Sequence, residues 1–395
     1  MVCESLVREE IETIFGIPGG GAIHLYHALP EYPIHHVLMR HERAAAHAAD
    51  GYARATGKVG VCIATSGPGA TNLLTGLATA LRDSSPVVAI TGQAPSPVLG
   101  TDAFQEVDIA SITLPVTKHN YLVTDIQKLP RVIREAFYIA RTGRPGPVLI
   151  SVALDVQAAV IDYVYPNGVD FAGYRPVEQQ RHDSPLMEKT AQMVNQDGRV
   201  EPAQQDIVAQ ETGEPVAHYV THQIWRATQG DAWMVSDLRQ DRTWGAQYPV
   251  RDWCRDLISS SGLGTSGFAL PAAIGTQMAC PDELVWVIVG DESFQMSFQE
   301  LATIVQEQLP IKIAVLNRSN PGPMHQLQPL PSGGRCNALS LPGPDFVGVA
   351  NAYGIPGLTV RKRNEVFPAI ARAMASEGPI LVDFGISEIL RHECG

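Results

Sequence analysis

Short apolar runs alternate with helical patterns along the first 157 residues of the chain. Three runs are rich in β-branched residues, which favours strands: "VGVCIATSG" (59–67), "SPVVAITG" (85–92) and "GPVLISVAL" (146–154). Apolar residues recur at i, i+3, i+4 and i+7 in the segments that separate or flank these runs, which predicts helices over 42–56, 69–83 and 129–142. Strand–helix–strand units of this kind build a parallel sheet that helices cover on both faces.

This alternation of strand-like runs and helical segments stops near residue 158 and returns near residue 215. Residues 158–214 are rich in Gln, Asp and Glu and contain no strand-like run, so they predict a partly ordered linker. Beyond them, "LVWVIVGD" (284–291) and "IKIAVLN" (311–317) are again strand-like and lie between helical segments. The predicted fold class is therefore α/β, with two doubly wound parallel-sheet domains at 1–157 and 215–395.

Composition excludes several classes of function. The formal net charge is −12 over 395 residues and no basic cluster offsets it, so no nucleic-acid partner is expected. Six scattered cysteines without a CxxC pair indicate reduced thiols in a cytoplasmic protein. Charged residues every few positions in "MVCESLVREEIETIFG" predict an amphipathic helix and not a signal peptide. No apolar run approaches the roughly 18–20 residues that a membrane span needs, so no membrane partner is expected.

Two segments of the first half place polar groups at strand-to-helix junctions. Glu42 opens an Ala-rich helical segment, where a carboxylate is favoured by the helix dipole whatever its function. "TSGPGATN" (65–72) is a tight turn with Gly67 and Asn72, and a single glycine-rich turn is weak evidence for a ligand site. "GTDAFQEVD" (100–108) indicates a loop and carries no signal by itself.

One segment of the second half ends in a pair of residues that often holds a metal-bound diphosphate. In "VGDESFQMSFQEL" (289–301) an apolar strand leads into Gly290 and Asp291. The next residue is Glu292, a carboxylate at a position where a close approach of the backbone to phosphate favours glycine.

Taken together and in this order, these segments resemble the thiamine-diphosphate enzymes, and within them the acetolactate (acetohydroxyacid) synthase catalytic subunits. The matching runs include "HHVLMRHERAAAHAADGYARATGKVGVCIATSGPGATNL", "GLGTSGFALPAAIG" and "GDESFQMSFQELATIVQEQLPIKIAVLN". The resemblance covers most of the chain. It implies a pyrimidine-binding first domain and a diphosphate-binding second domain, with thiamine diphosphate and Mg²⁺ as cofactors.

The resemblance also implies roles for individual residues. Glu42 would hydrogen-bond the pyrimidine ring and exchange a proton with it, a role that suits a partly buried carboxylate. Phe104 and Gln105 would border the substrate pocket and count as catalytic residues with Glu42. The implied cofactor-binding set is Glu42, Gly67, Asn72, Gln240, Gly262, Leu263, Gly264, Ser266, Gly290, Asp291, Glu292, Ser293 and Asn317. The implied metal ligands are Asp291, Asn317 and Ser319.

The activity that the resemblance implies is a carboligation within branched-chain amino acid biosynthesis. Pyruvate is decarboxylated and its two-carbon unit is added to a second 2-keto acid. In this family the site lies between the first domain of one subunit and the second domain of another, so a homodimer or a dimer of dimers is expected, with a regulatory small subunit as a further candidate partner. The family's middle domain carries much of its FAD site. Because residues 158–214 are too few for that domain, no FAD is expected.

Four single residues depart from the pattern of this family. Glu292 stands for glycine, and Arg318 stands for an asparagine whose side-chain oxygen ligates the metal; arginine has no acceptor to offer. Ser266 stands for an apolar residue under the cofactor, and Leu154 stands for a lysine near the substrate entrance. A like-charge contact between Glu292 and a diphosphate at ~4 Å would cost about 4 kcal/mol at an effective dielectric constant of ~20.

Several interpretations of these departures stay open. The chain could be a degenerate homologue that keeps its fold and binds the cofactor weakly. Arg318 could contact the diphosphate directly and pair with Glu292, replacing part of the metal's charge. Asp291 could still hold Mg²⁺, with Asn320 or Glu292 as a substitute ligand. A simple 2-keto acid decarboxylase is the alternative activity, since such enzymes include forms without the middle domain.

Overall fold

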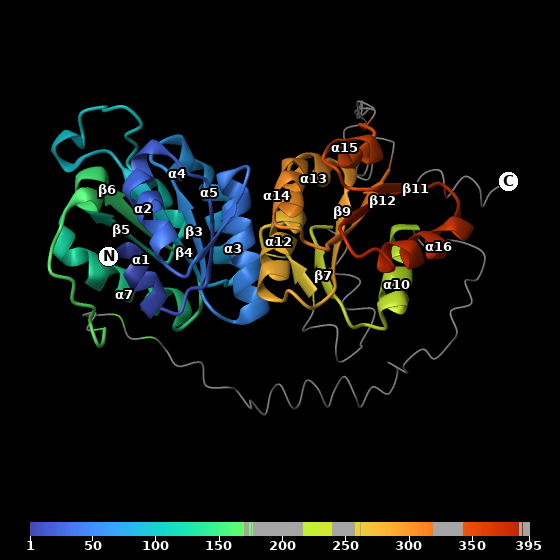
Figure 1. Ribbon diagram of the computed structural model, residues 1–395, viewed down its shortest axis with the longest axis horizontal. Coiled ribbons are helices and arrows are strands. Elements are labelled where there is room, and N and C mark those ends of the chain that lie inside the picture. Colours follow the sequence, from blue (N-terminus) through green and yellow to red (C-terminus); the bar gives the residue numbers. More distant parts are fainter. Residues whose placement is uncertain are drawn as a thin grey trace, which may run out of the picture.

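Two α/β domains make up the computed structural model, which describes residues 1–169, 174, 176, 216–238, 257–260, 262–318, 343–386 and 389. Each domain is built on a six-stranded sheet in which every pair of neighbouring strands is parallel (Figure 1). The predicted fold class is confirmed. The predicted linker is described for residues 158–169 and at Tyr174 and Pro176, and the rest of it lies outside the described residues.

The first sheet has the strand order β2-β1-β3-β4-β6-β5. Its strands are β1 (Thr13–Gly16), β2 (His35–Leu38), β3 (Gly60–Ala64), β4 (Val87–Gln93), β5 (His119–Val123) and β6 (Val148–Ala153). Its helices are α1 (Val2–Arg8), α2 (Ile23–Ala28), α3 (Glu42–Thr56), α4 (Pro68–Asn72), α5 (Leu74–Asp83), α6 (Ile109–Thr113), α7 (Leu129–Arg141) and α8 (Leu154–Ala158). The central strands β3, β4 and β6 are buried along their whole length, as continuous apolar runs predict.

The N-terminus differs from its prediction. The helix that was predicted through "IETIFG" ends at Arg8, and Thr13–Gly16 forms β1 instead. β1 pairs with β2 on one side and β3 on the other, and all of its residues are buried. Tertiary burial of Ile14 and Phe15 therefore outweighs the helical spacing of the charged residues before them.

The second sheet has the strand order β11-β12-β10-β9-β7-β8. Its strands are β7 (Trp233–Ser236), β8 (Leu257–Ser259), β9 (Val285–Gly290), β10 (Lys312–Asn317), β11 (Gly357–Val360) and β12 (Ile380–Gly385). Its helices are α10 (Val216–Thr228), α12 (Ala269–Ala279), α13 (Asp291–Gln295), α14 (Leu301–Gln306), α15 (Phe346–Ala352) and α16 (Arg363–Met374). A 3₁₀ turn at Phe298–Glu300 leads into α14.

Helices α3 and α12 pack against each other and join the two domains (Figure 1). Their crossing is lined by small residues: a side-chain carbon added at Gly51 would collide with the Ala272 carbonyl oxygen, and one at Gly275 with the Ala48 carbonyl oxygen. Such backbone-to-backbone proximity leaves no room for a Cβ. One hydrophobic core therefore runs from the first sheet through both helices to the second sheet.

His47 lies in this shared core without a hydrogen-bond partner for either ring nitrogen among the described residues. Its ring meets the Phe268 ring edge-on, with the centroids 5.2 Å apart. Burial, and then the positive charges of Arg43 and Arg54, lower the pKa of His47 to about 3. The imidazole is therefore neutral at ordinary pH and serves as an aromatic packing element between the domains.

Candidate functional site

Glu42 is the first residue of α3, and three residues separate it from the end of β2 at Leu38. The His41 side chain caps the helix by accepting from the Arg43 N–H (3.1 Å), so the backbone at Glu42 is fixed. Asn72 at the end of α4 donates to Glu42 Oε2 (2.9 Å). The other carboxylate oxygen lies over Gly69, 3.3 Å from where a Cβ would stand. The predicted residues Glu42 and Asn72 are thus brought together, with one side of the carboxylate left for a ligand.

Gly67 and Gln105 also meet. Gly67 has φ +60° at the start of α4, and a Cβ there would come within 2.9 Å of the Gln105 Cβ and carbonyl oxygen. Only glycine fits such a turn with so close a neighbour. The Phe104 side chain is 90% exposed in the single chain, so its place beside the substrate pocket stays a prediction.

A second glycine-rich segment, residues 18–22, was missed by the sequence predictions. Its Gly21 N–H donates to Thr65 Oγ1 (2.9 Å), and Gly19 packs directly on the Thr65 side chain. A Cβ at Gly92 would collide with the Gly21 carbonyl oxygen. The segment therefore lies over the carboxyl ends of β3 and β4, the edge where parallel sheets bind ligands. Its signal was present in "GIPGGGAIH", which directly follows an apolar run.

The loop between β8 and α12, residues 259–268 without the undescribed Ser261, is the predicted diphosphate loop. Several of its N–H groups are already used inside the protein: Gly264 donates to the Ser260 carbonyl (3.1 Å) and Thr265 to Ser260 Oγ (2.9 Å). Among the described residues, Leu263 and Ser266 are left with N–H groups that have no acceptor. Gly264 has φ +72° and open space where a Cβ would stand. A diphosphate therefore has two free donors and room to approach the backbone.

Asp237, at the end of β7, is a buried acid that the sequence predictions missed. Its Oδ2 accepts from Ser293 Oγ (2.5 Å), Gly267 N (3.1 Å) and Ala269 N (3.2 Å), so it ties the start of α12 to the segment after β9. Its Oδ1 is buried and has no hydrogen-bond partner among the described residues. Burial raises the pKa of this carboxyl, and the Ser293 hydroxyl and the α12 amides oppose that shift. The only sequence signal for Asp237 was its position directly after a strand-like run that ends in Ser236.

Asp291 follows β9, and its carboxylate spans to the next strand. Oδ1 accepts from the Glu292 N–H (3.1 Å) and Oδ2 from the Arg318 N–H (3.2 Å), just beyond Asn317 at the end of β10. Burial raises the pKa of Asp291; the two N–H donors and the Arg318 charge oppose this, while Glu292 adds to it. Glu292 and Arg318, two of the residues that depart from the family pattern, therefore both donate a backbone N–H group to one carboxylate. The Glu292 side chain is exposed.

The two halves of the site meet through Arg43, the neighbour of Glu42. Its guanidinium donates to the Met296 carbonyl (2.5 Å) and lies 3.3 Å from where a Cβ on Gly267 would stand. The end of α3 that carries Glu42 therefore touches both the diphosphate loop and the segment after Asp291. Of the remaining predicted residues, Gln240 and Ser319 lie outside the described residues.

Glu300 is a third acid at the domain boundary, and it is fully buried. Its two oxygens accept from the Arg40 N–H (3.2 and 3.1 Å), directly before the helix that begins with Glu42. Thr303, which donates to Glu300 (3.3 Å), also donates to the Leu38 carbonyl (2.8 Å). Burial raises the pKa of Glu300 to about 7, and the Arg40 N–H opposes this shift. No motif marked this residue, because its partners lie 260 positions away in the chain.

The raised pKa of Glu300 predicts a particular dependence of stability on pH. Between its unfolded value near 4.5 and its folded value of about 7, the folded chain binds the extra proton and the unfolded chain does not. The contribution of Glu300 therefore falls as pH rises through this window. Glu300→Gln is expected to remove that fall, which is worth up to about 3 kcal/mol at ~1.4 kcal/mol per pKa unit.

Urea unfolding of both proteins at pH 5 and pH 7.5 measures the effect. Glu31→Gln, which removes an exposed carboxylate of the same first domain as Arg40, controls for the loss of one negative charge. Parallel pH dependence in the wild type and Glu300→Gln would contradict the assignment.

Two parallel-sheet domains in which a helix headed by a glutamate lies beside a glycine-rich loop are typical of enzymes that use a diphosphate cofactor. Residues 1–112 match the N-terminal TPP-binding domain of thiamine pyrophosphate enzymes, and residues 240–384 match their C-terminal TPP-binding domain. The chain belongs to the thiamine pyrophosphate enzyme family.

Curated relatives refine the placement within this family. The acetolactate synthase large subunit of Corynebacterium glutamicum is 32% identical, over 98% of this chain and 86% of its own length. Acetolactate synthase of Arthrospira platensis is 34% identical (97% and 93%), and acetolactate synthase isozyme 2 large subunit of Escherichia coli K12 is 34% identical (98% and 95%). These alignments run over 522 to 539 positions against 395 residues, so more than a hundred aligned positions have no residue in this chain.

The residues present fit thiamine diphosphate with Mg²⁺. Gly264, with open space at a positive φ, and the free N–H groups of Leu263 and Ser266 suit the diphosphate. Mg²⁺ takes one or two carboxylates together with phosphate oxygens and waters, so Asp291 and the diphosphate supply a workable set without the asparagine that Arg318 replaces. Among the described residues there is no cluster of three His, Cys, Asp or Glu side chains that would hold a metal unaided. No helix in the described part of the chain is long and apolar enough to cross a bilayer.

Proposed function

We propose that the chain is a thiamine-diphosphate-dependent carboligase of the acetolactate synthase type, which joins two 2-keto acids with loss of CO₂ in branched-chain amino acid biosynthesis. The observation that carries this proposal is the contact of Arg43 with Met296 and Gly267. It places the Glu42 end of α3 beside the diphosphate loop, so the two cofactor-binding halves face each other. The names of the relatives support the choice of acetolactate as the product.

The residues around the site have separate roles in the proposed reaction. Thiamine diphosphate, when bound, supplies the electron sink that decarboxylation of a 2-keto acid requires. Glu42 holds and exchanges a proton at its free carboxylate side, and Asn72 fixes the orientation of the carboxylate. The apolar contact between α3 and α12 seals the base of the site from water.

A coupled assay for acetolactate from pyruvate, with thiamine diphosphate and Mg²⁺ present, tests the activity. Acetolactate as the main product is the expected result. Release of CO₂ with acetaldehyde as the sole product would replace the proposal with a simple 2-keto acid decarboxylase. That alternative is favoured by the many positions of the relatives that are missing from this chain.

Cofactor binding itself is expected to depend on the metal. Saturating thiamine diphosphate with Mg²⁺ should raise the melting temperature by several degrees, because a ligand at 100 times its Kd adds about 2.7 kcal/mol of stability. EDTA is expected to abolish the shift, since Asp291 binds the diphosphate only through the metal. A shift that survives EDTA would mean that Arg318 replaces the metal's charge. The absence of any shift would identify a degenerate homologue.

A homodimer with shared sites, to which a regulatory subunit is added, is also part of the proposal. In the structure the contacts between α3 and α12 are made within one chain. Exchange of the second domains between two copies would build the same contacts between chains. Analytical ultracentrifugation with cofactor bound is expected to show a dimer or larger assembly, and a monomer that retains full activity would contradict it. FAD has no place in the proposed reaction.

A further inference from the structure

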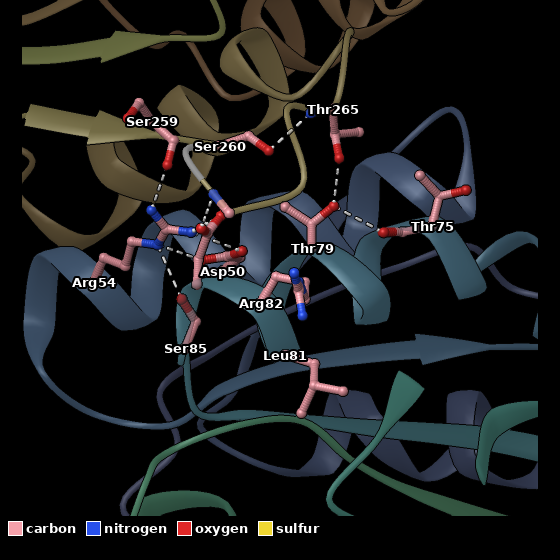
Figure 2. Close-up of polar contacts among 12 residues, drawn as sticks. Asp50, Arg54, Thr75, Thr79, Leu81, Arg82, Ser85, Ser259, Ser260 and Thr265 are labelled. Carbon is pink, nitrogen blue, oxygen red and sulfur yellow. Dashed lines mark hydrogen bonds and ion pairs between the residues drawn. The ribbon is translucent and has the colours of Figure 1, made fainter. Parts of the chain in front are cut away.

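The diphosphate loop is held from outside its own domain (Figure 2). Arg54 of α3 donates to the Ser259 carbonyl (2.7 Å), and Asp83 at the end of α5 accepts from the Gly262 N–H (2.6 Å). Both contacts cross from the first domain to the loop, and they join residues that are 205 and 179 positions apart in the chain. The loop is therefore anchored by residues of the first domain.

The anchor is itself organised by charge. The Nε atom of Arg54 donates to Asp50 Oδ1 (2.7 Å) and to Ser85 Oγ (2.9 Å). Its Nη2 atom donates to Asp83 Oδ2 (3.0 Å). Asp50 is fully buried and Asp83 nearly so. Charge-assisted bonds to two carboxylates fix the planar guanidinium, so the Ser259 contact has a defined direction. Asp83 uses one oxygen for Arg54 and the other for the loop.

Two further features tighten the same contact. Thr79 of α5 and Thr265 share a buried hydroxyl–hydroxyl hydrogen bond of 2.8 Å (Figure 2). A Cβ at Gly262 would stand 2.6 Å from Asp83 Oδ1 and 2.9 Å from the Arg82 Cβ. Glycine is required at this position because the loop lies directly on the first domain.

We propose that Asp83 and Arg54 are positioning residues that hold the described residues of the diphosphate loop, 259, 260 and 262–268, in the conformation that receives the cofactor's diphosphate. The N–H groups of Gly262, Gly264 and Thr265 donate to acceptors within the protein, so among the described residues of the loop the free donors are those of Leu263 and Ser266. Where these two donors point is set by the conformation of the loop. A loop that is ordered before the cofactor arrives binds it more tightly, because binding then costs no further conformational entropy of the loop. This inference rests on the proposed function.

Asp83→Ala and Asp83→Asn test it, with Arg144→Ala as the matched control. Asparagine keeps an acceptor for Gly262 and alanine keeps none. Arg144 binds the residues on either side of Asp83, donating to Ser84 Oγ (2.8 Å) and to the Arg82 carbonyl (3.1 Å), without a contact to the second domain among the described residues. Hydrogen exchange is followed on a peptide that covers 257–268 in the cofactor-free protein. Affinity for thiamine diphosphate with Mg²⁺ is measured by calorimetry.

Asp83→Ala is expected to speed exchange at Gly262 at least about tenfold and to weaken cofactor affinity about tenfold, with kcat at saturating cofactor little changed. Asp83→Asn should fall between it and the wild type, and Arg144→Ala should match the wild type. Unchanged exchange in Asp83→Ala, or faster exchange with unchanged affinity, overturns the inference. A wild-type chain that binds no cofactor would overturn the proposed function and the role of the loop in it, while the exchange measurement would still decide whether Asp83 holds the loop.

Discussion

Glutamine in place of Glu42 is expected to lower kcat for acetolactate formation by at least about 100-fold, the lower end of what a positioned proton-transfer group contributes. Glutamine has nearly the same shape as glutamate and keeps an oxygen for the Asn72 amide, which donates to Glu42 at 2.9 Å. It cannot exchange a proton near neutral pH. The loss should therefore appear in kcat, with the fold and the cofactor affinity largely retained.

Steady-state kinetics and cofactor titration of the same preparation separate these effects. Glu31→Gln, an exposed carboxylate in the same domain, is the control for a lost charge and should keep full activity. A Glu42→Gln enzyme with more than a tenth of the wild-type kcat would show that the proton is handled elsewhere. Loss of cofactor affinity alone would assign Glu42 to binding and not to proton transfer.

Valine in place of Gly275 is expected to destabilise the folded chain by about 3 kcal/mol or more. A Cβ at Gly275 would run into the Ala48 carbonyl oxygen and approach the Tyr52 N–H to 2.9 Å, so α12 would have to move away from α3. Backbone atoms in the middle of two helices cannot yield as a flexible side chain can. The domains should separate at lower denaturant concentration than the wild type.

Urea unfolding followed by tryptophan fluorescence measures this change. Met278→Val is the matched control, because it places the same β-branched side chain on α12 at a half-buried position. It is expected to cost less than about 1.5 kcal/mol. If Gly275→Val lowers the free energy of unfolding no more than Met278→Val does, the α3–α12 contact can adjust to an added side chain and the prediction is wrong.

The sequence was sufficient for the fold class and for the local parts of the site. Strand-like runs such as 59–67 and 311–317 predicted buried parallel strands, because a strand covered on both faces is apolar along its whole length. Glu42 and Asn72 were both assigned to the cofactor-binding set by resemblance, and the structure shows that their side chains share a hydrogen bond.

The contacts between the domains could not be predicted in the same way. Glu300 reaches Arg40 across 260 positions, and Arg54 reaches Ser259 across 205. Such pairs depend on how two helices cross, which periodicity within either helix does not encode. Asp237 was overlooked because a single acid after a strand has no distinctive spacing. Phe104 was assigned to the substrate pocket by resemblance alone, and its ring is 90% exposed in the single chain.

The shared core of α3 and α12 means that neither domain is a self-sufficient unit. Residues 44–53 of α3 are all buried in the complete chain, yet in an isolated first domain the face turned towards α12 would be a bare apolar stripe in water. Selection on this chain therefore acts on the two halves together: a substitution on one helix must be tolerated by the facing helix. The two halves recognise each other through the facing surfaces of α3 and α12.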